Sequence, residues 1–284
     1  MSMSPRLLRP RQTLHPEAAD WAARVVANGG TVSGTTLSAV DKFCKAIASA
    51  GIRDRFYRLG IFAGSNLNAA LVPLYRGPSL GGTQYGNATD TNVGGLFVGG
   101  DYNETGASGG LNNAARTKHL DTGFATNTLS DGNRHLAAYA RTWPNAQFDD
   151  MVGSESNASI SQQFCLGHQS SASQVFFGCF SNTSRIGSSA VSSGAFWLGA
   201  NYSPGNAFLY RNGVQDSSGS TTAATPTSSS VFVFATNRAS TSIPTDYFGG
   251  TLGGYSIGLS MTAPQADAYN TAMQAFQTAL TRNV

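Results

Sequence analysis

The carboxylates that come nearest to a catalytic spacing are three acidic residues in the middle of the chain, Asp149, Asp150 and Glu155. A retaining glycoside hydrolase needs two carboxyl groups about 5–5.5 Å apart, which a single strand provides at positions i and i+2 or i+4 of one face. Asp149 and Asp150 are adjacent, so we expect them on opposite faces of a strand, and we expect Glu155 in a turn after Gly153. The sequence therefore favours solvated loop carboxylates and predicts a protein that is not an enzyme, with no catalytic residues.

The histidines show no metal-binding pattern. The chain has four of them, His15, His119, His135 and His168. They form no i, i+4 pair and have no neighbouring cysteine or acidic cluster, so a zinc site is not expected. Calcium is bound by oxygen ligands, and Asp90 and Asp101 in a long loop are its candidates. Side chains that cap turns are the simpler interpretation of both residues. We expect no cofactor and keep calcium as the alternative.

Two of the three cysteines lie in a predicted hairpin, and the third lies on the apolar face of a predicted helix. Runs 161–168 and 174–181 flank a short polar segment, with Cys165 and Cys179 symmetric about Ala172. They could therefore face each other. With no export signal, a reduced pair is favoured and a disulfide is the alternative. Cys44 is expected to be a small core residue.

Five aromatic residues could form a platform for glycans, because aromatic faces match the apolar faces of sugars. They are Trp143, Trp197, Tyr202, Tyr210 and Tyr247. Packing in the core of a β-sandwich is the alternative for each of them.

The composition is typical of a turn-rich β protein. Only 12% of the 284 residues are charged, 33 are glycines, and 40% are hydrophobic, which is enough to build a core. The net charge of +3 is too small to predict nucleic-acid binding. No segment is long and apolar enough to cross a membrane, and the N-terminus lacks the apolar region of a signal peptide.

The elements follow from periodicity and turn residues. Helices are predicted at about 16–28, 36–50 and 263–281, where apolar residues recur every three or four positions. The C-terminal helix is expected to dock on its own protein. Segment 76–115 is predicted to be a long loop with one strand near 96–98. Short strands separated by turns follow from about 119 to 260, with a hairpin turn at Asn212 and Gly213.

The N-terminal arm, residues 1–14, is basic and aperiodic, and we expect it to be an attachment element. Its candidate residues are Arg6, Leu7, Leu8, Arg9 and Arg11. We divide the rest into segment 15–115, with a helical hairpin and the long loop rich in Gly and Asn, and segment 116–284, with the strands and the closing helix.

The end of the chain resembles a concanavalin A-like (laminin-G-like) jelly roll. The resemblance rests on the hairpin sequence LYRNG at 209–213 and on the Gly-rich strand FGGTLGGYSI at 248–257, followed by a closing helix. It implies a mainly β protein, an antiparallel β-sandwich with a small N-terminal helical region and a C-terminal helix.

Segments along almost the whole chain resemble a family of tailed-bacteriophage and prophage structural proteins. These segments are 15–18, 27–30, 53–59, 71–77, 86–92, 118–123 and 269–282. The resemblance implies a non-enzymatic virion protein, such as a capsid decoration, a head fibre or a tail or baseplate component. Its partners would be other virion proteins and its own copies, with a trimer favoured. The alternative is a carbohydrate-binding receptor or adhesion module that recognises host-surface glycans.

Overall fold

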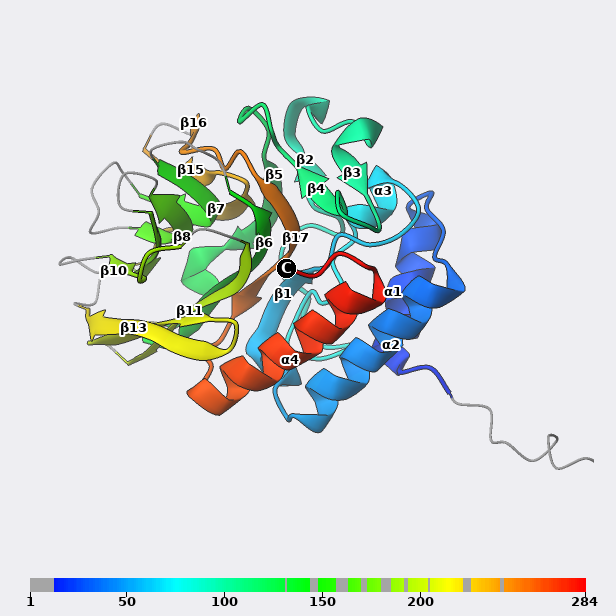
Figure 1. The fold of residues 1–284 in the computed structure, drawn as a ribbon, viewed down its shortest axis with the longest axis horizontal. Coiled ribbons are helices and arrows are strands. Elements are labelled where there is room, and N and C mark those ends of the chain that lie inside the picture. The colour runs from blue at the N-terminus through cyan, green and yellow to red at the C-terminus, as the bar shows by residue number, and fades with distance from the viewer. Residues whose placement is uncertain are drawn as a thin grey trace, which may run out of the picture.

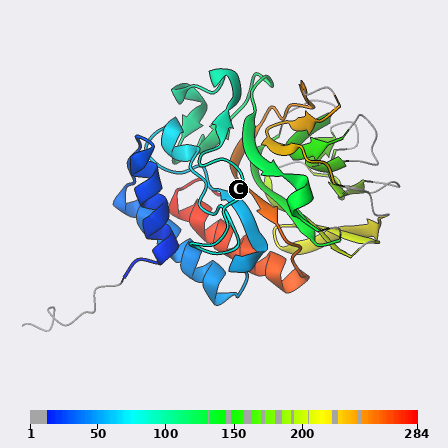
Figure 2. The same cartoon turned by 180° about the vertical axis from the view of Figure 1, so that it is seen from behind.

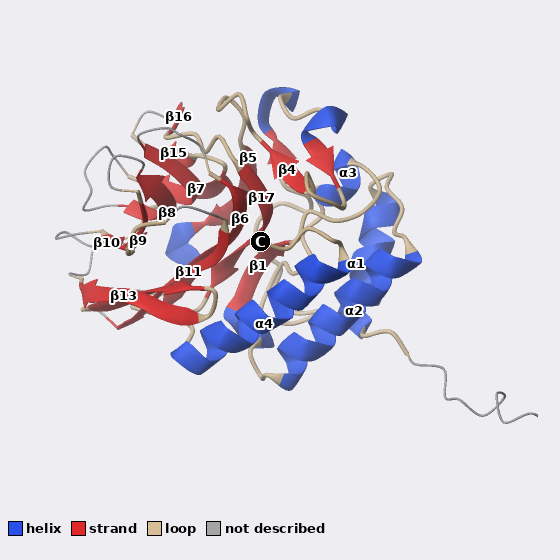
Figure 3. Cartoon of the chain, in the orientation of Figure 1, coloured by secondary structure: helices blue, strands red, loops and turns tan. Residues whose placement is uncertain are grey.

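The computed structural model describes residues 13–130, 132–143, 148–156, 163–169, 173–179, 185–191, 194–203, 205–221, 226–240 and 243–284. Two antiparallel sheets form a sandwich, and helices cover the outer face of one of them (Figure 1). Figure 3 shows the long helices gathered at one side of the molecule, with most of the strands beside them. The predicted mainly β, antiparallel sandwich with helices near both ends is confirmed.

The three long helices of the described residues form where the apolar periodicity predicts them, and a fourth, of only four residues, was not predicted. Their bounds are α1 Pro16–Ala27, α2 Gly34–Ser49, α3 Leu67–Ala70 and α4 Ala263–Ala279. Side chains cap their first turns, since His15 Nδ1 accepts from the Glu17 amide at 3.3 Å and Gln265 Oε1 accepts from the Thr262 amide at 2.9 Å. These caps satisfy amide groups that a helix leaves unpaired.

The first sheet has the order β13-β12-β11-β6-β17-β4-β3, with β1 also paired to β17. Its strands are β1 Phe56–Gly60, β3 Tyr102–Asn103, β4 Gly110–Asn112, β6 Arg134–Thr142, β11 Ala195–Ser203, β12 Asn206–Arg211, β13 Val214–Ser220 and β17 Thr251–Gly258. The β12–β13 hairpin turns at Asn212 and Gly213, whose φ angles are 49° and 80°. The Asn-Gly turn predicted here is confirmed.

The second sheet has the order β10-β9-β8-β7-β14-β5-β2, and β15 joins it beside β7. Its strands are β2 Thr91–Asn92, β5 Leu120–Ala125, β7 Phe148–Glu155, β8 Gln163–Gln169, β9 Gln174–Cys179, β10 Ile186–Gly187, β14 Ser230–Val233, β15 Thr236–Arg238 and β16 Ile243–Thr245. Seen from behind, this sheet lies at one side of the molecule and α1 at the other (Figure 2).

Segment 15–115 shares both sheets with segment 116–284. It supplies β1, β3 and β4 to the first sheet and β2 to the second. The strand predicted near 96–98 is wrong, because these residues lie between two 3-10 turns, Val93–Gly95 and Gly99–Asp101. Four glycines in this stretch, two of them at positive φ, favour turns over an extended strand.

Two hydrophobic cores lie on opposite faces of the first sheet. Successive residues of β11 alternate between them: Trp197 faces the second sheet, and Phe196 and Leu198 face the helices. All three side chains are almost fully buried. The first sheet is therefore the central layer of a helix–sheet–sheet arrangement.

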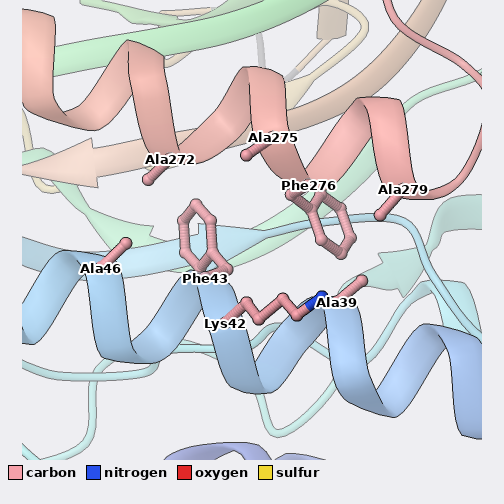
Figure 4. A pocket seen from close by; sticks show the side chains of 8 residues that line it. All are labelled: Ala39, Lys42, Phe43, Ala46, Ala272, Ala275, Phe276 and Ala279. Atoms are coloured by element: carbon pink, nitrogen blue, oxygen red, sulfur yellow. The ribbon is translucent and has the colours of Figure 1, made fainter.

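Helix α4 docks on the first sheet and on α2, as predicted. The Tyr269 ring meets that of Phe196 on the sheet, with centroids 4.8 Å apart. The Phe276 ring meets Phe43 of α2 edge-on, with centroids 5.9 Å apart. Between α2 and α4 a small apolar pocket of about 60 Å³ remains, which alanines and these two phenylalanines line (Figure 4).

The cysteine pair does not face across its hairpin. In the register of β8 and β9, Cys165 pairs with Gly178 and Cys179 pairs with Phe164. The pairing is shifted by one residue from the symmetric one, which places the two thiols on opposite faces of the sheet. Neither is in a disulfide, nor is Cys44, and all three are buried.

Candidate functional site

The three carboxylates singled out in the sequence all lie on β7, and the expectation that they are solvated loop residues is wrong. Asp149, Asp150 and Glu155 are at most 1% exposed. The strand runs on through Gly153, and Glu155 is its last residue, paired with Gln163 of β8. A glycine inside a strand marks close packing here, since a Cβ on Gly153 would lie 2.5 Å from Thr236 Oγ1.

Each of these carboxylates has a protein partner. Arg116 pairs with Asp149, and the Thr236 hydroxyl donates to Asp150. Arg238 Nε lies 2.5 Å from Glu155 Oε1, and Gln163 donates to the other oxygen at 2.7 Å. This arrangement is an internal ionic network along one sheet, in which no carboxylate faces open solvent.

Burial sets the protonation of this network. It raises the pKa of Asp150 to about 7, with a further contribution from the negative charge of Asp246. Burial also raises the pKa of Asp149 to about 6, although Arg116 opposes the rise. Two neighbouring acids are therefore biased toward the neutral form. Catalysis would require these acids to reach a substrate, and both are fully buried in the fold.

The predicted aromatic platform is not assembled. Trp197 is fully buried between the sheets, and Trp143 packs against it, with ring centroids 6.5 Å apart. Tyr247 stands beside His119, with centroids 5.9 Å apart. Tyr210 belongs to the core on the opposite face of the first sheet. The side chain of Tyr202 lies outside the described residues.

One of the predicted aromatics, Tyr210, does line a groove. The groove encloses about 370 Å³ at the surface, between the β12–β13 hairpin and the start of α4. Its residues are Asn206, Phe208, Tyr210, Gln215, Thr262 and Ala263. Phe208 and Tyr210 are two positions apart on β12, so both side chains leave the same face. Their rings are nearly parallel, at 26°, with centroids 6.4 Å apart.

The groove lies between the β12–β13 hairpin and the start of α4. In Figure 1 the first turn of α4, in orange, lies beside this hairpin, where β13 is labelled in yellow. Phe208 is half-buried, whereas Tyr210 is only 2% exposed and supports the floor. The sequence analysis missed Phe208, although its i, i+2 spacing from Tyr210 before the Asn-Gly turn was a usable signal. We call the six residues together the β12 groove.

A second cluster was also missed. His15, Glu17 and Cys44 place one potential metal-ligand atom each within 4.8 Å of one another. The expectation that no histidine has a neighbouring cysteine or acid is wrong at this point, because α1 and α2 bring the residues together. The guanidinium of Arg53 already pairs with the carboxylate of this cluster, since Arg53 Nε lies 2.6 Å from Glu17 Oε1. Burial raises the pKa of the Cys44 thiol to about 12, which disfavours the thiolate that binds metals.

The two calcium candidates have cationic partners. Asp90 is buried and accepts from Arg58 Nη2 at 2.5 Å and from the Tyr255 hydroxyl at 2.8 Å. Asp101 pairs with Lys118 Nζ at 2.6 Å. Both carboxylates therefore serve the fold. Residues 1–12, with the predicted attachment residues Arg6, Leu7, Leu8, Arg9 and Arg11, lie outside the described residues.

Comparisons with known proteins give structural neighbours only. No family model matches the chain, and no curated protein matches it. Domain 4 of an extracellular arabinanase from Geobacillus stearothermophilus, solved with arabinotriose, aligns over 76% of this chain and 98% of its own, with 13% identity and a TM-score of 0.45. The CBM40 module of a Ruminococcus gnavus sialidase aligns over 56% and 91%, with 13% identity and a TM-score of 0.40.

A sialidase from Streptococcus pneumoniae is also similar, over 54% of this chain and 26% of its own, with 12% identity and a TM-score of 0.40. At these identities the likeness concerns the β-sandwich. Within the described residues, no helix has both the length and the apolar character needed to cross a membrane.

Proposed function

We propose that this chain is a non-catalytic carbohydrate-binding protein and that the β12 groove is its binding site. The observation that carries the proposal is the near-parallel pair of Phe208 and Tyr210 rings in an open groove of about 370 Å³. A groove of this size accommodates a small sugar. The half-buried ring of Phe208 offers an apolar face, and sugars present matching C–H faces.

Polar groups at the rim of the groove suit sugar hydroxyls. Asn206, Gln215 and Thr262 are exposed and belong to its lining. Their amides and hydroxyl both donate and accept hydrogen bonds, as sugar hydroxyls do. None of the described residues that line the groove is charged, which favours a neutral saccharide at this site.

The structural neighbours are compatible with this proposal and leave the sugar open. One was solved with arabinotriose and another with sialyllactose, and both names refer to those proteins. The absence of catalysis is part of our proposal, because the ionic network on β7 keeps Asp149, Asp150 and Glu155 away from solvent.

A glycan array with the purified protein tests the proposal, followed by titration of the best glycan against Phe208→Ala. Loss of the stacking face should weaken binding at least about tenfold, or about 1.4 kcal/mol. Phe148→Ala is the matched control, because Phe148 is an exposed aromatic on the other sheet. Failure of the native protein to bind any glycan, or unchanged affinity in Phe208→Ala, would refute the proposal.

A second candidate function is that of a virion structural protein, supported by the sequence resemblance. Leu80, Leu96 and Val98 favour it, because these apolar side chains are 45–57% exposed in segment 76–115. Light scattering of the purified chain would show a trimer if these residues mediate self-assembly. A monomer in both the native chain and Val98→Asp would argue against assembly through this segment.

A further inference from the structure

Arg76 is a cationic side chain that forms no ion pair with any acid in the described part of the chain; Asp20, which lies near it, is paired with Arg24. Arg76 is half-buried, its Nε atom is buried without a hydrogen-bond partner, and none of the ion pairs among the described residues includes it. The two other arginines near it each have an acidic partner: Arg24 pairs with Asp20 at 2.8 Å, and Arg58 pairs with Asp90 at 2.5 Å. A buried donor without a partner costs free energy unless a ligand satisfies it.

Two cavities meet at this side chain. One has about 290 Å³ and is lined by Arg24, Ala27, Asn28, Val72, Arg76, Ala88 and Thr89. The other has about 320 Å³ and is lined by Asp20, Arg24, Arg76, Leu80, Gly81, Gly82 and Gln84. Both are open to solvent and share the two arginines, so a small molecule that enters either cavity meets both guanidinium groups.

The charges that face the cavities leave an excess of one positive charge. Arg24 is held in place by the carbonyls of Pro73 and Leu74, at 2.7 and 3.0 Å, and by Asp20. The charges of Arg58 and Asp90 balance each other in a buried ion pair. Arg76 therefore carries the unbalanced charge. Burial, together with repulsion from Arg24 and Arg58, lowers its pKa, which is the environment that an added anion would relieve.

We propose that Arg76 and Arg24 form a binding site for the oxyanion of a small molecule, a carboxylate or a phosphate. The guanidinium of Arg76 offers two parallel N–H donors, which match the oxygens of either group. The Thr89 hydroxyl and the Gln84 amide line the two cavities and can donate to the rest of the ligand. Each cavity has the volume of a sugar-sized molecule and excludes a polymer from its interior.

This site is independent of the β12 groove, whose described lining residues carry no charge. The test is isothermal titration of the full chain at low ionic strength with D-glucuronate, inorganic phosphate and D-glucose. We expect saturable binding of glucuronate or phosphate and none of glucose at this site. The stronger of the two anions identifies whether the oxyanion is a carboxylate or a phosphate. Added salt should weaken binding, because partly exposed charges are screened.

Arg76→Gln should weaken anion binding at least about tenfold, since a charge-assisted hydrogen bond is lost. Lys42→Gln is the matched control, because it removes the same charge from an exposed position on α2. Ala88→Phe fills the first cavity without a change of charge and keeps the test valid if Arg76→Gln is unstable. The inference is wrong if the native protein binds neither anion, or if Lys42→Gln weakens binding as much as Arg76→Gln. Phe208→Ala should leave anion binding unchanged.

Discussion

Replacement of Asp150 by Asn should make the protein less sensitive to alkaline pH. Asp150 is 1% exposed, and burial and Asp246 raise its pKa to about 7. The folded state therefore holds a proton that the unfolded chain releases near pH 4. Because the folded state binds more protons between these two pKa values, the stabilisation contributed by Asp150 is greatest below pH 4 and is lost as the pH rises through about 7.

The magnitude follows from the two pKa values. A rise of about three units corresponds to about 4 kcal/mol in full, of which about 3 kcal/mol is lost between pH 5 and pH 8.5. Asparagine keeps an acceptor for the Thr236 hydroxyl and carries no titrating proton. The free energy of unfolding in urea, measured at both pH values, should fall less in Asp150→Asn than in the native protein by about this amount.

Asp54→Asn serves as the control, because the side chain of Asp54 is 61% exposed. It should show the pH dependence of the native protein. If the native protein and Asp150→Asn lose the same free energy between pH 5 and pH 8.5, the carboxyl is ionised in the fold and our reasoning about its burial fails.

Three further predictions concern packing and pH. Phe276→Ala, which removes a ring packed on Phe43, should lower the free energy of unfolding in urea by about 3–5 kcal/mol without a change in oligomeric state; a change in oligomer size alone would identify an interface instead. His135 is fully buried, and burial lowers its pKa to about 4, so its contribution to stability is lost as the pH falls from about 6.5 to 4. His135→Gln should therefore show a smaller decrease in melting temperature over this range than the native protein. An equal decrease would contradict the lowered pKa of His135. Gly199→Ala places a Cβ 2.2 Å from the Phe177 ring across the sandwich and should cost about 1–3 kcal/mol in urea unfolding; an unaffected midpoint would mean that the two sheets separate easily.

Much of the fold could be predicted because its signals are local. The positions of α1, α2 and α4, where apolar residues recur every three or four positions, and the Asn-Gly turn of the β12–β13 hairpin depend on residues close together in the sequence. Each was recognised from sequence and confirmed. The apolar stripe of α4 likewise predicted a docked face, and Phe276 and Leu280 are buried in it.

Charged residues with long-range partners could not be predicted. Arg282, near the end of the chain, is fully buried and donates to the carbonyls of Ile61 and Phe62 at 2.6 and 2.7 Å. Asp90 forms an ion pair with Arg58, which is distant in the sequence, and Glu155 of β7 forms one with Arg238. Composition suggests that charged residues are exposed, and only the fold shows that they are paired and buried. The same limit hid the cluster of His15, Glu17 and Cys44.

The sequence of the central strands explains where a binding site can form. In β6 the run Leu136–Ala140 is apolar and buried at every position. Strand β17 is also buried along its whole length and includes Gly254 beside Tyr255. Such a strand is buried on both faces, unlike one that alternates apolar and polar residues. The small residues let neighbours approach, since a Cβ on Gly254 would lie 2.8 Å from the carbonyl oxygen of Gly60. With both faces of these strands covered, the β12 groove forms farther out in the first sheet, where the β12–β13 hairpin lies beside the start of α4.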